Sequence, residues 1–197
     1  MNKSIGIIIL AAGASTRLGQ PKQLLIYQEH SFIFNTVEIA VNSDCAPIVV
    51  VLGAYADLIF PEISNFPVKI VKNCDWQEGM NSSIKLGINN LKATQENLEA
   101  VLLMLCDQPF VSTQLIKKII DVYYLTGKAI VACEYAATFG VPALFSAKFF
   151  PEMLNLKTAK GAKQIIKNYS YQVATVDFPK GEIDIDTFAD YQQLTNL

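Results

Sequence analysis

The sequence contains few of the side chains on which most zinc sites and nucleophilic catalytic sites depend. Its 197 residues include one histidine, His30, and four cysteines scattered without any Cys-x-x-Cys pair: Cys45, Cys74, Cys106 and Cys133. A zinc site with the usual ligand clusters is therefore not expected. His30 lies in a polar turn, which favours a solvent-facing side chain over a general base. The cysteines are expected to be small buried residues in a reducing compartment.

Charge and long apolar runs are also scarce. Charged residues make up 17% of the chain and the net charge is −2, which excludes a broad basic surface for nucleic acid or an anionic membrane. No apolar run reaches the roughly 18 residues of a transmembrane helix. The amino-terminal MNKSIGIIILAAG superficially looks like a signal peptide, but it leads directly into a loop with Arg17 and Lys22, as a first buried strand does. A cytoplasmic protein is expected.

Two familiar phosphate-binding patterns are missing. Gly19 follows Gly13 by six positions, and Lys22 comes three later and is followed by Gln23, so the spacing of a P-loop is not met. The dinucleotide fingerprint needs three glycines and an acid after the second strand, but the apolar run 48–52 ends in Gly-Ala-Tyr.

A loop of small and basic residues follows the first apolar run. Its backbone amides, free of bulky side chains and flanked by two cations, predict a receptor for a polyphosphate. The candidate residues are Leu10, Ala11, Ala12, Gly13 and Ser15, with the cations Arg17 and Lys22. The alternative is an ordinary strand-to-helix turn, in which glycine and serine are common.

Apolar runs alternate with helix-like stretches along the whole chain. The expected strands are 5–11, 48–52, 68–71, 100–105 and 129–133, with shorter ones at 141–145, 172–176 and 183–185. The expected helices are 32–41, 82–91, 113–125, 147–154 and 159–169, with Ser112 as an N-cap, Gly127 as a stop and one more helix around 189–194. This alternation predicts a single α/β domain over 1–197: a three-layer Rossmann-like fold with a mostly parallel central sheet.

Carboxylates follow two of these runs. Asp107 comes directly after the strand 100–105, at the edge where the glycine loop is also expected, and Asp184 and Asp186 share one side of an extended segment. Carboxylates beside a phosphate site are ligands for Mg²⁺. The alternatives are an Asx turn at Asp107 and a helix cap at Asp186 or Thr187.

The segment 76–83, Trp-Gln-Glu-Gly-Met-Asn-Ser-Ser, reads as a loop that enters a helix. Gly79, Ser82 and Ser83 at a helix start are candidates for binding a base or a phosphate. The alternative is that Trp76 packs on the core and a serine caps the helix.

Over nearly its whole length the sequence resembles the nucleotidyltransferases related to molybdenum cofactor cytidylyltransferase. The resemblance rests on five segments in the family's order: 10–22, 76–83, 107–109, 140–142 and 184–190. The first matches Leu-Ala-Ala-Gly-x-Ser-x-Arg-Met-Gly-x-Pro-Lys, with Leu18 in place of Met. The chain departs at Ala159 and Lys163, where the family usually has an acid and an Arg, and at Phe188, where it has Pro. Lys lacks the bidentate fork of Arg, so recognition of the second substrate is expected to differ.

The resemblance implies a Mg²⁺-dependent nucleotidyltransferase with CTP as donor and molybdopterin as acceptor. Arg17, Lys22 and Asp107 would be catalytic, with Arg17 and Lys22 countering the phosphate charge, and Asp107, Asp184 and Asp186 would hold the metal; which of the last two is the ligand stays open. A phosphate of the acceptor would attack the α-phosphorus, pyrophosphate would leave, and a molybdoenzyme would receive the product. Ala12 fits cytidylyl members better than guanylyl ones.

Two other readings remain. One is a nucleotidyltransferase that acts on a sugar phosphate or an alcohol phosphate. The other is a non-catalytic nucleotide- or pterin-binding chaperone for cofactor insertion, because a fold does not guarantee its usual activity.

Overall fold

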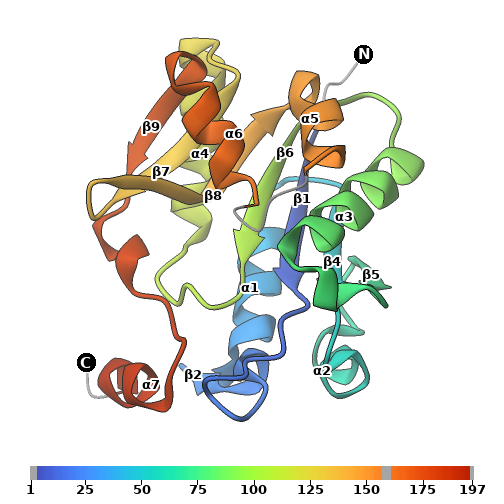
Figure 1. Ribbon diagram of the computed structural model, residues 1–197, viewed down its shortest axis with the longest axis vertical. Helices are drawn as coiled ribbons and strands as arrows, with labels where there is room; N and C mark the ends of the chain where they lie inside the picture. Colours follow the sequence, from blue (N-terminus) through green and yellow to red (C-terminus); the bar gives the residue numbers. More distant parts are fainter. Residues whose placement is uncertain (1–3, 157–160, 196–197) are drawn as a thin grey trace.

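A computed structural model describes residues 4–156 and 161–195, and in it seven strands form one sheet in the order β5-β4-β1-β6-β8-β7-β9 (Figure 1). These strands are β1 (Ser4–Ala11), β4 (Ile48–Leu52), β5 (Lys69–Lys72), β6 (Leu98–Leu105), β7 (Ile130–Tyr135), β8 (Thr138–Ser146) and β9 (Val173–Asp177). Strand β8 is antiparallel to its neighbours β6 and β7, and all other pairs are parallel. A separate small hairpin joins β2 (Ile26–Tyr27) to β3 (His30–Ser31). The predicted mostly parallel central sheet is confirmed.

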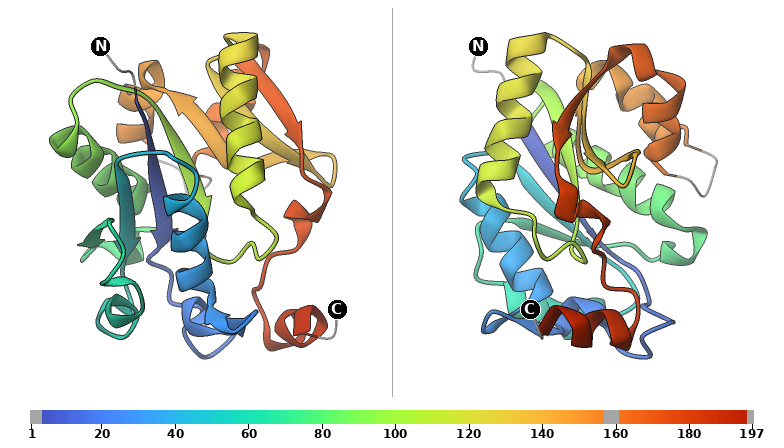
Figure 2. Two further views of the ribbon diagram at one scale, coloured as in Figure 1. Left: turned by 180° about the vertical axis from the view of Figure 1, so that it is seen from behind. Right: turned by 90° about the vertical axis from the view of Figure 1, so that its left-hand side faces the viewer.

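Helices cover both faces of this sheet (Figure 2). They are α1 (Phe32–Val41), α2 (Ala56–Ile63), α3 (Met80–Thr94), α4 (Thr113–Thr126), α5 (Phe150–Leu154), α6 (Lys163–Asn168) and α7 (Phe188–Thr195). Successive residues of β1 point to opposite faces: Ile7 and Ile9 pack in the core with α1, α2 and α4, whereas Ile8 and Leu10 pack in the core with α3, α5 and α6. The three predicted layers are therefore present.

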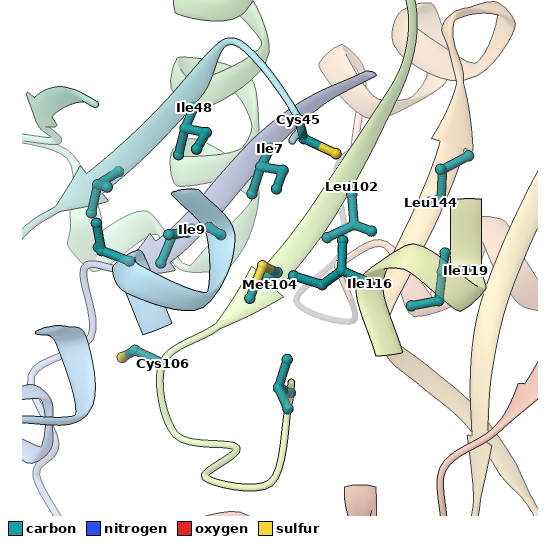
Figure 3. Close-up of a cluster of buried hydrophobic side chains, with 14 of the residues drawn as sticks. Ile7, Ile9, Cys45, Ile48, Leu102, Met104, Cys106, Ile116, Ile119 and Leu144 are labelled. Atoms are coloured by element: carbon teal, nitrogen blue, oxygen red, sulfur yellow. The ribbon is translucent and has the colours of Figure 1, made fainter. Parts of the chain in front are cut away.

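The near-continuous apolar runs of the strands are explained by this double coverage. Ile9 and Met104 of the central strands are fully buried and belong to the same core cluster as Ile116 and Ile119 of α4, with Met104 beside Ile116 (Figure 3). Each such side chain contributes roughly 1.5–3 kcal/mol through its transfer from water. The sheet is thus a rigid base for the loops at its edges.

Local signals set several element ends. The side chain of Ser112 accepts a hydrogen bond from the amide of Leu115, and Gly127 has a left-handed φ of 62° just after α4. The predicted cap and stop of this helix are confirmed. Short 3-10 helices occur at Lys22–Leu24, Trp76–Glu78, Ala147–Phe149, Ser170–Gln172 and Pro179–Glu182.

Three expectations about elements need correction. Residues 183–185 form an extended segment without strand pairing, because Ile185 is anchored in a side-chain cluster instead of a sheet ladder. Helix α2 was not expected, since Pro61 inside it reads as a break. Helix α6 begins at Lys163, later than expected at 159; residues 157–160, with Ala159, lie outside the described part.

The chain order of the strands marks one place on the sheet edge. From β1 the chain moves outward to β4 and β5, and then crosses to β6 on the other side of β1. Ligands of open α/β sheets bind at such a switch point, outside the carboxyl ends of the strands. Within residues 4–156 and 161–195, none of the helices has the length and apolarity to cross a membrane.

Candidate functional site

A cavity of about 400 Å³ opens at the carboxyl ends of β1 and β6, where the strand order reverses. It is lined by three segments that are far apart in the sequence: the loop after β1, the start of α3 with the 3-10 helix before it, and the end of β6. The lining residues are Leu10, Ala11, Ala12, Gly13, Ala14, Ser15, Thr16, Lys22, Gln23, Trp76, Gln77, Gly79, Met80, Ser83, Leu105, Cys106 and Asp107. The volume suits a small-molecule ligand.

The side chain of Gln23, which is almost fully buried, holds the loop after β1. Its Nε2 donates hydrogen bonds to the carbonyls of Ala11, at 3.1 Å, and Gly13, at 2.9 Å. The amide of Lys22 donates to the Ser15 hydroxyl at 3.2 Å, and Ser15 itself has a φ of 51°. These contacts fix the curved backbone that faces the cavity.

The start of α3 is held by Asn73, a buried residue at the end of β5. Its Nδ2 donates to the hydroxyls of Ser82, at 2.8 Å, and Ser83, at 2.9 Å. Gly79, with a φ of 95°, turns the chain into the helix, so that the first turn of α3 faces the cavity. The positive end of the helix dipole therefore points toward the same space as the loop.

Charged side chains meet at the edge of this cavity. The ammonium of Lys22 lies 2.5 Å from Oδ2 of Asp107 and 3.2 Å from Oδ1 of Asp186, and Arg17 reaches Oδ2 of Asp186 at 2.6 Å. Burial acts to lower the pKa of Lys22, but the charge of Asp107 and hydrogen bonds to Asp107 and Asp186 outweigh it, so the pKa is raised. Lys22 is therefore a permanent cation between two carboxylates.

Asp186 reaches this network through an extended segment that precedes α7. The amide of Ile185 donates to the carbonyl of Asp107 at 3.1 Å, and the Ile185 side chain is fully buried. It packs in a small cluster with Leu25, Phe32 and Leu194. We call residues 183–195 the carboxylate arm; in Figure 1 its helix α7 lies below the sheet, near β2.

Asp184 and Asp186 of the carboxylate arm differ in their surroundings. Burial and then the neighbouring charges of Asp186 and Asp107 raise the pKa of Asp184. Capping of α7 belongs to other residues, because the Thr187 hydroxyl accepts from the amide of Asp190 at 3.2 Å and the Asp190 carboxylate accepts from the amide of Thr187 at 2.7 Å. Asp186 is thus free of the capping role considered for it.

The structure places most of the predicted site residues together. Arg17, Lys22, Asp107 and Asp186 form one network, and the following residues line the adjoining cavity: Leu10, Ala11, Ala12, Gly13, Ser15, Gly79 and Ser83. Ser82 is not among the lining residues and holds the loop at 75–79 through its hydroxyl. Asp184 forms no ion pair with the other described residues, and in the described part of the chain no three His, Cys, Asp or Glu side chains form a ready metal cluster.

Sequence reasoning missed Gln23, Asn73 and Ile185. Asn73 had a visible signal, since it follows a predicted strand at the ligand edge, but Gln23 and Ile185 act by hydrogen bonding and packing that no short pattern reveals.

The sequence also predicted the exposure of the cysteines and of the histidine. Three cysteines are buried as expected, whereas Cys74 is exposed because it lies in the loop after β5. His30 is exposed and stacks on Phe34 with 4.2 Å between ring centroids.

The chain is similar in sequence to several known proteins. A family model described as the MobA-like NTP transferase domain matches residues 7–174. Nicotine blue oxidoreductase of Paenarthrobacter nicotinovorans is 34% identical over 114 residues, which cover 57% of this chain and 54% of that protein. Purine catabolism protein PucB of Bacillus subtilis is 25% identical over 199 aligned positions, which cover 95% of this chain and 94% of that protein. The chain thus matches about half the length of the first relative.

Solved structures extend the similarity to the whole chain. Rv0371c from Mycobacterium tuberculosis is 29% identical with a TM-score of 0.86, and the match covers 99% of both chains. Its complex with manganese has a TM-score of 0.78 at 28% identity, covering 98% of this chain and 99% of that one. A nucleotidyl transferase from Methanothermobacter has the same fold, with a TM-score of 0.83 at 19% identity over 99% of this chain and 97% of that one. The predicted three-layer Rossmann-like nucleotidyltransferase fold is confirmed.

Proposed function

This chain belongs to the MobA-like NTP transferase family, and from that premise we propose that it transfers a nucleoside monophosphate from a triphosphate to a phosphate group of an acceptor. We further propose CTP as the donor and molybdopterin as the acceptor, in line with Ala12 and the sequence segments that resemble the cytidylyl branch. The observation that carries the proposal is the meeting of the Gly13 loop, Lys22, Asp107 and Asp186 at one cavity.

The cavity suits a triphosphate that lies over the loop after β1. Backbone amides of the loop and the first turn of α3 face its phosphates, and Arg17 and Lys22 counter their charge. Little covalent chemistry is left to the protein in phosphoryl transfer, because positioning and neutralisation of charge provide most of the rate. This explains how the reaction proceeds without a histidine in the site.

A divalent metal fits the donor set. Oδ1 of Asp107 is buried and has no hydrogen-bond partner among the described residues. Asp186 shares the ammonium of Lys22 with Asp107, and the charge of Asp107 helps to raise the pKa of Asp184. Oxygen ligands of this kind suit Mg²⁺ or Mn²⁺. Asp107, Asp184 and Asp186 would hold the ion, which when bound neutralises charge on the phosphates and the leaving pyrophosphate. The manganese complex of Rv0371c supports a divalent-metal requirement.

The position of the acceptor relative to the α-phosphorus follows from the arrangement of the loop after β1, α3 and the carboxylate arm. An acceptor phosphate must approach the α-phosphorus opposite the leaving pyrophosphate, on the side of the cavity away from the loop. The triphosphate is held by the loop and by α3, whereas the carboxylate arm stands beside the reacting centre. In this proposal the protein orients the two anions relative to one another.

The name of one relative, an oxidoreductase, raises the question of hydride transfer. A dinucleotide places its pyrophosphate on a helix that begins directly after the first strand. Here residues 12–31 intervene between β1 and α1, and they contain a 3-10 helix and the hairpin β2-β3. This geometry favours the transferase reading.

The test is a screen of the four nucleoside triphosphates with Mg²⁺ or Mn²⁺ against molybdopterin, sugar phosphates and alcohol phosphates, in which release of pyrophosphate is recorded. We expect pyrophosphate with CTP and molybdopterin. Turnover with a sugar phosphate or alcohol phosphate alone would reassign the acceptor. Tight binding of CTP without pyrophosphate from any acceptor would favour the non-catalytic chaperone, and oxidation of NADPH in a parallel assay would contradict transfer.

A further inference from the structure

Lys22 pairs with two of the three carboxylates that the proposed function assigns to a metal, those of Asp107 and Asp186. Its Nζ lies 2.5 Å from Asp107 and 3.2 Å from Asp186, and its side chain is 16% exposed. The Asp107 side chain is 12% exposed and that of Asp186 is 28% exposed, so the contact is largely shielded from solvent. Ion pairs in such surroundings are screened less than those at an open surface.

An ammonium and a divalent cation compete for the same oxygens. Oδ2 of Asp107 and Oδ1 of Asp186 both face Lys22, and a metal shared by these two side chains requires the ammonium to move away. Arg17 does not stand in the way, because it is 70% exposed and binds the other oxygen of Asp186. The competition is therefore specific to Lys22.

A Lys22 side chain that leaves the carboxylates can contact a triphosphate in the cavity instead. Lys22 lines the cavity, and its amide is bound to the hydroxyl of Ser15 in the loop proposed to carry the phosphates. Rotation of the side chain would carry the ammonium from the carboxylates toward a triphosphate over this loop, whose carbonyls at Ala11 and Gly13 are held by Gln23. A triphosphate thus supplies the negative charge that Lys22 loses when it leaves Asp107.

We propose that Lys22 acts as an internal counter-cation that keeps free divalent metal off Asp107 and Asp186 and yields these carboxylates only when a metal–triphosphate complex enters. The inference rests on the proposed function for the identity of the incoming ligand. Binding of metal and of triphosphate are then coupled, because each favours the same displaced position of Lys22. The site selects the metal–nucleotide complex over the free ion.

The experiment measures binding of Mn²⁺ alone, without nucleotide, by the loss of the electron paramagnetic resonance signal of the free ion. The proteins compared are the wild type, Lys22→Met and Lys117→Met. Lys117 is a matched control, since it pairs with Asp44 at 3.0 Å at the opposite end of the strands and its replacement removes the same charge. We expect Lys22→Met to bind Mn²⁺ on the order of tenfold more tightly than wild type, and Lys117→Met to match wild type.

A second variant and a second readout guard against misfolding. Lys22→Gln is expected to behave as Lys22→Met does, and Mn²⁺ is expected to raise the melting temperature of both variants more than that of wild type. Adding Asp107→Asn to Lys22→Met is expected to abolish the gain. Unchanged or weaker Mn²⁺ binding in both folded Lys22 variants overturns the proposal.

The outcome is separable from that of the proposed function. Pyrophosphate release by the wild-type enzyme tests the transferase reaction, whereas the Mn²⁺ measurement contains no nucleotide. Turnover in the wild type together with unchanged Mn²⁺ affinity in the variants would refute only the role of Lys22. Tighter Mn²⁺ binding in a protein without transferase activity would refute only the function.

Discussion

The two carboxylate oxygens of Asp107 have different surroundings. Oδ2 accepts from the ammonium of Lys22, while Oδ1 is buried without a partner among the described residues. A buried oxygen of this kind costs free energy unless a ligand or a cation satisfies it. At the scale of single residues, Lys22 therefore satisfies one oxygen of Asp107, and the other oxygen is left for a bound cation.

Replacing Asp107 with Asn keeps the shape of the side chain and removes its charge. We expect Asp107→Asn to lower the turnover number by about 10²-fold or more, because one positioned electrostatic group is lost. The melting temperature should stay close to that of wild type, since Asp186 still pairs with Lys22. Near-normal pyrophosphate release by this variant would show that the site is elsewhere.

The four cysteines give a further prediction at this scale. Burial raises the pKa of both Cys106 and Cys133 to about 12 and also raises the pKa of Cys45, whereas Cys74 is exposed. Because the thiolate is the reactive form, the buried thiols stay unreactive between pH 7 and pH 9. A chromogenic disulfide reagent should label Cys74 quickly in the native protein and the others only after denaturation. Rapid labelling of a Cys74→Ser variant would contradict this assignment.

Prediction from the sequence brought out those site residues whose type alone carries chemistry, and their roles stay predictions. Lys22, Asp107 and Asp186 were singled out as charged groups after apolar runs, and the structure brings them within ion-pair distance. Gln23 and Asn73 escaped notice because they act on backbone carbonyls and serine hydroxyls that only the folded chain brings near. Buried polar side chains of this kind leave no periodic trace in a sequence.

At the scale of elements, the site consists of a braced loop and a docked arm. The loop after β1 depends on the two hydrogen bonds from Gln23, and the carboxylate arm depends on Ile185 and on the hydroxyl of Tyr191, which donates to the carbonyl of Ile26 at 2.8 Å. Neither element is held by a sheet ladder. Their positions are therefore sensitive to single side chains outside the cavity.

The brace of the loop is tested by Gln23→Leu. The substitution keeps the volume but leaves the carbonyls of Ala11 and Gly13 without their donor, at a cost of about 1–3 kcal/mol in the free energy of unfolding. We expect a higher KM for the triphosphate and a lower melting temperature. Thr36→Val is the matched control, because it removes a buried hydrogen bond to the carbonyl of Phe32 within α1. An equal rise of KM in both variants would contradict a specific role for Gln23.

The anchor of the carboxylate arm is tested by Ile185→Ala. The side chain is fully buried in a small cluster, so its loss weakens the arm more than the sheet. We expect the metal concentration for half-maximal activity to rise about 10-fold to 100-fold, as for residues that orient metal ligands. Ile63→Ala is the control: Ile63 is the last residue of α2 and is buried in the core, so its loss should lower the melting temperature without this rise. An unchanged metal concentration for half-maximal activity in Ile185→Ala would show that the arm does not position the metal ligands.

At the scale of the whole molecule, the alternation of apolar runs and helices was enough to predict the layers. It did not reveal that β8 runs antiparallel to β6 and β7, because a strand covered on both faces has the same composition in either direction. The pattern did not predict the order of the strands either. That order matters, because the cavity lies where the chain changes from one side of β1, with β4 and β5, to the other side, with β6. Residues 183–185 were predicted as a strand because an extended segment with a buried Ile185 has the same residue pattern as a strand.

The position of the carboxylate arm along the chain bears on how the protein is made. The Gly13 loop, Lys22, α3 and Asp107 all leave the ribosome well before Asp184 and Asp186. A nascent chain emerges and folds from its amino terminus onward, so the strands β1 to β8 precede the arm. Until Ile185 docks, the proposed metal site lacks the carboxylate of Asp186, so completion of that site is a late step of biogenesis.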